Sequence, residues 1–169
     1  MTSFDQLPDH ARVWIYQASR PLTDAELTAA APLLTQFTAG WVSHGRALLA
    51  GAAFRHRQFL LIGLDERQAG ASGCSIDASV HFVRGLEQRL GVSWLDKSQM
   101  AFWLDGQVRL FDRRALREAV AAGTLTADSP YFDNTLTTKG PLAAGWPAPA
   151  GQTWLRKYFS AVPQPGALV

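Results

Sequence analysis

The chain has 169 residues, of which 47% are hydrophobic and 18% are charged, and its one cysteine excludes an internal disulfide and every multi-cysteine zinc motif. This composition excludes disorder of the whole chain, because there is ample apolar surface to bury. The net charge is +2, with cations in three short clusters at Arg55–Arg57, Arg113–Arg117 and Arg156–Lys157. We expect one domain over residues 1–162 and a loose tail over 163–169.

The start of the chain does not resemble a secretory signal, since no cationic stretch precedes an apolar run before Arg12. The longest apolar run, Ala47–Phe54, is far shorter than the roughly 18 residues that span a bilayer. A single cysteine agrees with a reducing compartment. We therefore expect a cytoplasmic protein with no membrane partner.

The first predicted elements are a strand and a long helix. Arg12–Gln17 combines branched and aromatic residues, which favour a strand. Thr23 and Glu26 fit a T-x-x-E capping box, in which the two side chains satisfy unpaired backbone N–H groups. An apolar stripe at helical spacing then continues to Trp41, and we expect Pro32 to kink or interrupt that helix.

The middle of the chain predicts two strands and a second helix. The strands are Leu48–Arg55 and Gln58–Leu64, and the second is apolar enough to be buried on both sides. A loop of small residues over 65–75 leads to a helix that begins near Ile76 and ends before Gly91.

The last clear elements are a hairpin and a third helix. Met100–Leu104 and Gln107–Phe111 flank Asp105-Gly106, the strongest hairpin signal in the chain. Asp112 can cap a helix that extends to about Ala122. Beyond residue 123 the pattern is irregular, apart from a turn or two of helix near 154–159.

The order of these elements is β-α-β-β-α-β-β-α, and its first six match a split βαβ unit. We predict an α+β fold with an antiparallel sheet and helices on one of its faces. The core is expected to be ferredoxin-like, followed by a C-terminal hairpin, a helix and an irregular tail.

The loop from Gly70 to Asp77 is the strongest candidate for chemistry. Cys74 lies where a helix begins, and free N–H groups with the positive end of the helix dipole favour a reactive thiol there. Asp77 and His81 are four residues apart on that helix and share a face. Together they form a candidate catalytic set with Cys74 as nucleophile, His81 as base and Asp77 as the orienting carboxylate.

Two other interpretations of this loop remain open. In the structural one, the glycines turn the chain, Ser75 caps the helix and Cys74 is a small buried hydrophobe. In the binding one, Ser72, Gly73 and Ser75 form a nest for an anion. The nearest match to a P-loop, residues 91–98, has Asp96 in place of the second glycine, so we expect no ATP hydrolysis.

Histidine 44 follows the first predicted helix, and Gly45 after it is a typical helix stop. Its ordinary role would be in the last helical turn, but it is also an alternative base for Cys74. His44, His81, Asp77 and Cys74 are ligand types without a familiar metal-binding spacing, so we predict no metal and no cofactor.

Two further segments bear on partners. In the polar run Asn134–Lys139, the side chains of Thr137, Thr138 and Lys139 could clasp an anion, although such runs are more often loops. The predicted central strand is aliphatic and offers no platform for stacking bases, so we expect no nucleic-acid partner. Asp5, Asp9 and His10 have no recognisable partner.

Four segments and Trp154 resemble a small family of uncharacterised bacterial proteins. The segments are RVWIYQASRPLT (Arg12–Thr23), WVSHG (Trp41–Gly45), ASGCSIDASVHFV (Ala71–Val83) and NTLTTK (Asn134–Lys139). Members often carry the label "ABC transporter ATPase", which this chain does not support, because it lacks both a Walker A motif and an LSGGQ-like signature. The family implies no known activity. The resemblance suggests only that the SHG, GCSID and TTK segments form one site.

The sequence leaves the molecular function open among three hypotheses. The favoured one is a module that binds a small anionic ligand in a pocket at Gly70–Asp77. The second is a thiol-dependent enzyme with Cys74 as nucleophile. The third is a protein-interaction or homo-oligomeric module that works through exposed aromatic side chains.

Overall fold

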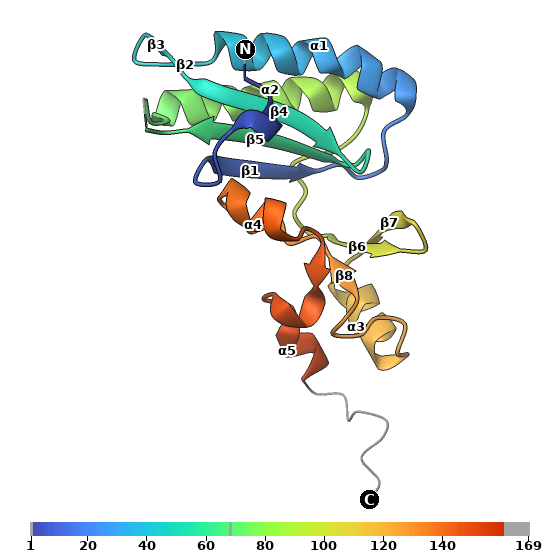
Figure 1. The fold of residues 1–169 in the computed structure, drawn as a ribbon. Coiled ribbons are helices and arrows are strands. Elements are labelled where there is room, and N and C mark those ends of the chain that lie inside the picture. Colours follow the sequence, from blue (N-terminus) through green and yellow to red (C-terminus); the bar gives the residue numbers. More distant parts are fainter. Residues whose placement is uncertain (1, 68, 161–169) are drawn as a thin grey trace, which may run out of the picture. The chain divides into compact units, whose positions relative to one another are not determined.

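The computed structural model describes residues 2–67 and 69–160, which form two compact units (Figure 1). Unit 1 combines the residues up to Asp96 with Asn134–Ala144, and unit 2 combines Lys97–Asp133 with the residues from Gly145 onward. Both contain helices and antiparallel strands, which confirms the predicted α+β class. The expected single domain stays a prediction, and the expected tail lies outside the described residues.

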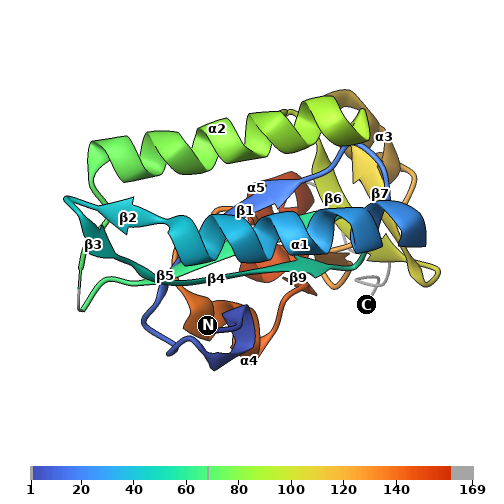
Figure 2. The ribbon, with the colours of Figure 1, turned by 90° about the horizontal axis from the view of Figure 1, so that it is seen from above.

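The sheet of unit 1 has three strands, β1 (Arg12–Gln17), β4 (Leu49–Arg55) and β5 (Phe59–Asp65), in the order β1-β5-β4 with antiparallel pairing throughout. Every residue of β5 is buried, as its continuous apolar sequence predicts. Figure 2 shows helices α1 (Asp24–Gly40) and α2 (Gly73–Leu90) side by side across this sheet. The helices cover the face to which Leu60, Ile62 and Leu64 point, and the main core lies between the helices and the sheet.

The opposite face of the sheet receives the N-terminal segment. Gly51 and Gly63 lie directly across from each other on β4 and β5. The short 3₁₀ helix η1 (Phe4–Gln6) and Leu7 lie against these glycines, and Phe4 and Leu7 are both buried. Two paired glycines therefore form a flat surface on which the N-terminal segment packs.

The outer edge of β1 is closed by a segment from far along the chain. Thr138 bridges Arg12, and the Val13 N–H donates to the Thr137 carbonyl at 2.8 Å. The Lys139 ammonium at the start of α4 (Lys139–Ala144) donates to the backbone carbonyls of Asp5 and Leu7. The ferredoxin-like detail of the prediction is not confirmed, because Met100–Leu104, the last strand of the expected split βαβ unit, belongs to the sheet of unit 2.

Helix α1 begins as predicted, with the reciprocal capping box of Thr23 and Glu26. It continues through Pro32 as one helix, and burial of its sheet-facing side favours that continuity. It ends at Gly40, so the expectation that Gly45 is its stop is wrong. His44 and Gly45 instead have φ values of +49° and +76°, and they form a tight turn. This turn joins β2 (Val42–Ser43) to β3 (Arg46–Ala47).

Unit 2 is built around a small sheet in the order β7-β6-β8-β9. Its strands are β6 (Met100–Leu104), β7 (Gln107–Phe111), β8 (Pro130–Tyr131) and β9 (Ala148–Pro149). Asp105 and Gly106 form the predicted hairpin turn with φ values of +51° and +77°.

The helices of unit 2 are α3 (Arg113–Ala121), η2 (Ala150–Gln152) and α5 (Arg156–Phe159). Asp112 caps α3 as expected, since its carboxylate accepts from the Ala115 N–H at 2.7 Å. A second core of Phe102, Leu116 and Leu155 lies between the helices and the sheet. Among the described residues of the chain, we find no helix that is both long and apolar enough to cross a membrane.

Candidate functional site

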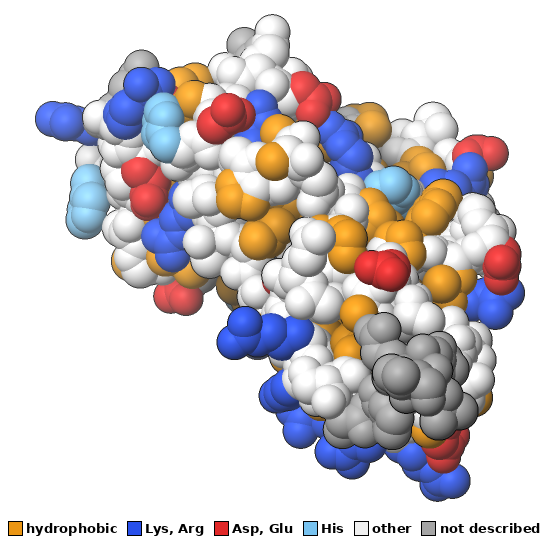
Figure 3. Space-filling model, turned by 60° about the horizontal axis from the view of Figure 1, so that its bottom comes forward, with side chains coloured by type: hydrophobic (Ala, Val, Ile, Leu, Met, Phe, Trp, Pro, Cys, Tyr) orange, Lys and Arg blue, Asp and Glu red, His pale blue; other side chains and the backbone are white. Residues whose placement is uncertain are grey.

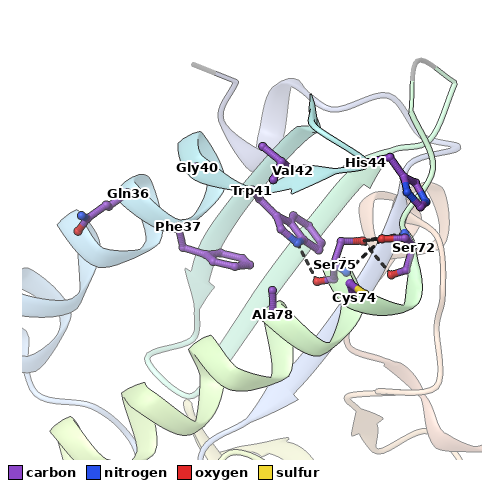
Figure 4. Close-up of a pocket in the computed structure, with 10 residues that line it drawn as sticks. All are labelled: Gln36, Phe37, Gly40, Trp41, Val42, His44, Ser72, Cys74, Ser75 and Ala78. Carbon is purple, nitrogen blue, oxygen red and sulfur yellow. Dashed lines mark hydrogen bonds between the residues drawn. The ribbon is translucent and has the colours of Figure 1, made fainter.

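A cavity of about 660 Å³ lies in unit 1 beside the end of α1, the β2–β3 turn and the first turns of α2 (Figure 4). Aromatic, aliphatic, polar and thiol side chains line it. The residues that bear on its chemistry are Phe37, Trp41, His44, Ser72, Cys74 and Ser75. Sequence positions 37–44 and 72–78 are therefore brought to one place by the packing of α1 against α2.

Aromatic side chains form the apolar part of this cavity. The Phe37 ring lies between those of Trp41 and Phe82, with centroid distances of 5.2 Å and 4.3 Å. The indole N–H of Trp41 donates to the Ser75 carbonyl at 2.8 Å, so the orientation of the Trp41 ring is fixed. The cavity thus has a rigid aromatic wall, which favours a ligand with an apolar part.

The first turn of α2 is closed by two serines. The Ser72 hydroxyl accepts from the Ser75 N–H at 3.2 Å, and the Ser75 hydroxyl accepts from the Ser72 N–H at 2.7 Å. Ser75 is buried, and its hydroxyl also donates to the Ser72 carbonyl. Within the described part of the chain, the backbone N–H groups of Gly73 and Cys74 have no hydrogen-bond acceptor. Two donors at the positive end of the helix dipole therefore remain free.

The candidate nucleophile and one of the two candidate bases line the same cavity. Cys74 is exposed at the second position of α2, and His44 is exposed on the β2–β3 turn. As far as the structure describes the chain, no hydrogen bond links the Cys74 thiol to a histidine. The arrangement gives a solvent-accessible thiol with an imidazole in the same cavity.

The other candidate catalytic residues lie elsewhere on α2. His81 is seven residues beyond Cys74, or about 10 Å along the helix axis. Asp77 and His81 are both exposed, neither lines the cavity, and between these two described side chains there is no ion pair or hydrogen bond. The face that borders the cavity carries Ala78 instead. The structure therefore does not form the expected contact in which Asp77 orients His81.

The predicted anion clasp of Thr137, Thr138 and Lys139 is also away from this cavity. These residues lie at the outer edge of β1, and the Lys139 ammonium is engaged by backbone carbonyls. Of the three segments expected to form one site, the SHG and GCSID segments are brought together and the TTK segment is not.

A second cavity of about 330 Å³ continues from the first along the groove between α1 and α2. The two share Gln36 and Phe37, so they form one groove. The second part is lined mainly by apolar side chains, including Leu33 and Phe82, and it reaches Arg89. The guanidinium of Arg89 forms no ion pair with any described residue.

A polar cluster at the end of β5 was not predicted from the sequence. The Asp65 carboxylate is only 3% exposed, accepts from Arg67 at 2.9 Å and lies 3.1 Å from Nε2 of His10. Hydrogen bonds from Arg67, and a weaker one from His10, outweigh burial and hold the pKa of Asp65 well below its usual range. An acidic residue at the end of an otherwise apolar strand is the signal that could have predicted this cluster. Among the described residues, no three His, Cys, Asp or Glu side chains are grouped to hold a metal ion.

Comparison with protein-family models, with curated proteins and with solved structures finds no match for this chain. The resemblance to the bacterial family described above therefore stays a prediction.

Proposed function

We propose that the protein binds a small amphiphilic anion in the groove between α1 and α2. The observation that carries this proposal is the cavity of about 660 Å³, which is lined by Cys74 in the first turn of α2, by the His44 imidazole and by aromatic side chains. A ligand that fills such a cavity needs both an anionic end and an apolar body.

The anionic end of the ligand would bind at the first turn of α2. The N–H groups of Gly73 and Cys74 are the donors there, because the hydroxyls of Ser72 and Ser75 are engaged in the helix cap. Backbone donors at a helix N-terminus favour carboxylate and phosphate groups. The His44 imidazole, which lies near Ser72 in Figure 4, can add a third donor.

The apolar body of the ligand would lie along the aromatic wall. Phe37 and Phe82 stack with their ring planes only 7° apart, and both border the continuation of the groove towards Arg89. Apolar contact contributes roughly 25 cal/mol per Å² of surface removed from water. Most of the affinity is therefore expected from the apolar part, and the orientation from the anionic end.

The test uses the single cysteine as the reporter. Cys74 lines the cavity, so a bound ligand should slow its alkylation by iodoacetamide. We expect octanoate and phenyl phosphate to protect the thiol from alkylation. Octanol, which lacks the anionic end, and inorganic phosphate, which lacks the apolar body, should protect it much less. Equal protection by all four compounds, or by none, would reject the proposal.

Matched histidine variants locate the ligand. His44→Asn keeps a residue that tolerates positive φ in the turn but removes the imidazole, so protection should require several-fold more ligand. His81→Asn makes the same change on α2 outside the cavity and should leave protection unchanged. Equal effects of the two variants would contradict a binding site at the first turn of α2.

A second candidate function, a thiol-dependent reaction, is favoured by the exposure of Cys74 in the same cavity as His44. In that case Cys74 is the nucleophile and His44 the base, since His81 and Asp77 do not border the cavity. The alkylation rate at neutral pH should then be well above that of an unactivated thiol, and only His44→Asn should lower it. A Cys74 thiol that reacts no faster than an unactivated thiol would exclude this function.

The remaining expectations follow from the sequence. We propose a cytoplasmic protein of the bacterial family that it resembles, without ATPase activity, because residues 91–98 lack the second glycine of a P-loop. A coupled ATPase assay on the purified protein tests the last point directly.

A further inference from the structure

The excess positive charge of the chain belongs to unit 2. Lys and Arg number nine in unit 1 against nine Asp and Glu, whereas unit 2 has seven against five. The net charge of +2 is thus concentrated in the smaller unit.

The cations of the two units also differ in their partners. In unit 1, five arginines form ion pairs with carboxylates: Arg12, Arg20, Arg55, Arg57 and Arg67. On the two helices α3 and α5 of unit 2, four exposed cations form no ion pair with any described residue: Arg113 and Arg117 on α3, and Arg156 and Lys157 on α5. Figure 3 shows one face of the molecule, on which several Lys and Arg side chains lie along the lower edge.

The arginines in the first turns of α3 lower the stability of this helix. Arg113 and Arg114 are the first two residues of the helix, where the positive end of the helix dipole disfavours cations. Arg117 is four residues after Arg113, so two like charges share one helix face. Only Arg114 is neutralised, by Glu118 at 2.8 Å. An arrangement that opposes helix stability favours a role in binding an anion.

An exposed aromatic side chain lies beside one of these cations, Lys157. Trp154 is 39% exposed, and its indole N–H donates to the Tyr131 hydroxyl at 3.2 Å, which fixes the ring. The Lys157 ammonium is 5.3 Å from the Trp154 ring centroid, and the Tyr158 ring is 6.4 Å from it. Helix α5 packs against α3 within unit 2, so the aromatic and basic side chains belong to one region.

We infer that this region of unit 2 binds single-stranded nucleic acid. Trp154 provides a fixed aromatic surface on which a base can stack, and the four unpaired cations can contact successive phosphates. An acidic protein could form ion pairs with these cations, but it has no bases to stack on the Trp154 ring. The inference is independent of the ligand groove, which lies in unit 1.

This inference revises one expectation from the sequence. Nucleic acid was not expected because the central strand is aliphatic, and β5 is indeed fully buried. That reasoning concerned the sheet of unit 1. The arginine cluster near 113 and the basic pair at 156 are separated in sequence, and the packing of α3 against α5 unites them.

The test measures binding of labelled oligo-dT and oligo-rU of about twelve nucleotides to the full chain as a function of salt. With four phosphate contacts, the logarithm of the affinity should fall with the logarithm of salt with a slope of about −3. Arg113→Gln with Arg117→Gln should reduce the slope to about −1.4. Trp154→Leu should weaken binding about tenfold while changing the slope little.

A charge-matched control separates local contacts from net charge. Arg46→Gln with Arg84→Gln removes two exposed, unpaired cations of unit 1 and should leave both affinity and slope unchanged. Circular dichroism establishes that each variant is folded. Equal weakening by both double variants would overturn the inference, and so would an absence of binding. Equally tight binding of polyglutamate, unaffected by Trp154→Leu, would also overturn it and would point to an acidic protein.

Discussion

The paired glycines under the N-terminal segment allow a sharp test of the fold. A Cβ atom on Gly51 would lie 2.6 Å from the backbone nitrogen of Phe4, so the backbone of the N-terminal segment must move. Phe4 and Leu7 are 4% and 2% exposed, and complete burial of such side chains contributes about 1.5–3 kcal/mol each. We expect Gly51→Ala to lower the free energy of unfolding by about 3 kcal/mol, with about 6 kcal/mol as the upper limit.

The same change on the partner strand should cost less. A Cβ atom on Gly63 would lie 2.5 Å from Cδ1 of Leu7, which is the end of a side chain and can shift. We expect a loss of about 1–3 kcal/mol for Gly63→Ala. Gly85→Ala on α2 is the matched control, because nothing lies within 4 Å of the added atom, and it should stabilise by about 0.5–1 kcal/mol.

Urea denaturation measures all three variants, with circular dichroism and tryptophan fluorescence compared to test for a single transition. Double variants sharpen the result. Leu7→Ala should relieve part of the cost of Gly63→Ala, whereas Phe4→Ala should not relieve Gly51→Ala, because that contact is with backbone. If Gly51→Ala unfolds at the same urea concentration as the wild type, the N-terminal segment does not pack on β4 as described.

Three further predictions concern charge and local conformation. Asp65→Asn should destabilise the protein at neutral pH, because Arg67 holds the folded-state pKa of this carboxyl below its unfolded value. The difference in unfolding free energy between wild type and variant should shrink as the pH falls below about 4. Urea midpoints between about pH 7 and pH 2 measure this difference. Thr23→Ala should cost about 1 kcal/mol in thermal unfolding through loss of the α1 cap, and Thr23→Ser should cost little. Gly106→Ala should cost about 1–2 kcal/mol because φ is +77° there, whereas Asp105→Asn, which suits the same turn, should be close to neutral in urea denaturation.

Features that depend on neighbours within a few residues were predicted correctly from the sequence. The α1 cap at Thr23, the Asp105-Gly106 turn, the α3 cap at Asp112 and the end of α2 before Gly91 all occur as expected. Each is decided by hydrogen bonds or backbone angles over three or four residues. Both partners of each such interaction therefore lie within one short stretch of the sequence.

Features whose partners are distant were missed. The closure of β1 by Thr138 joins residues more than a hundred positions apart, and the segment carries no strand pattern. The His44-Gly45 turn was missed because histidine is a less common first residue of such turns than asparagine. Neither could be found from periodicity, which reports only which side of an element is buried.

The candidate site was predicted in part. The sequence analysis named His44 and Cys74, and both line the α1–α2 cavity, although their chemical roles stay predictions. His81 and Asp77 do not line it, because Ala78 and not they occupy the side of α2 that borders the cavity. Which side of a helix borders a cavity depends on the tertiary packing, and spacing within one helix cannot supply that.

The order in which the chain builds its two units has a consequence for synthesis. The chain leaves unit 1 after Asp96, returns at Asn134, and leaves again after Ala144. On the ribosome, β1, β4 and β5 therefore emerge long before the segment around Thr138 that covers the edge of β1. During that interval the nascent chain exposes an unpaired strand edge, which is where association with another chain would begin. Completion of unit 1 must wait until most of unit 2 has been translated.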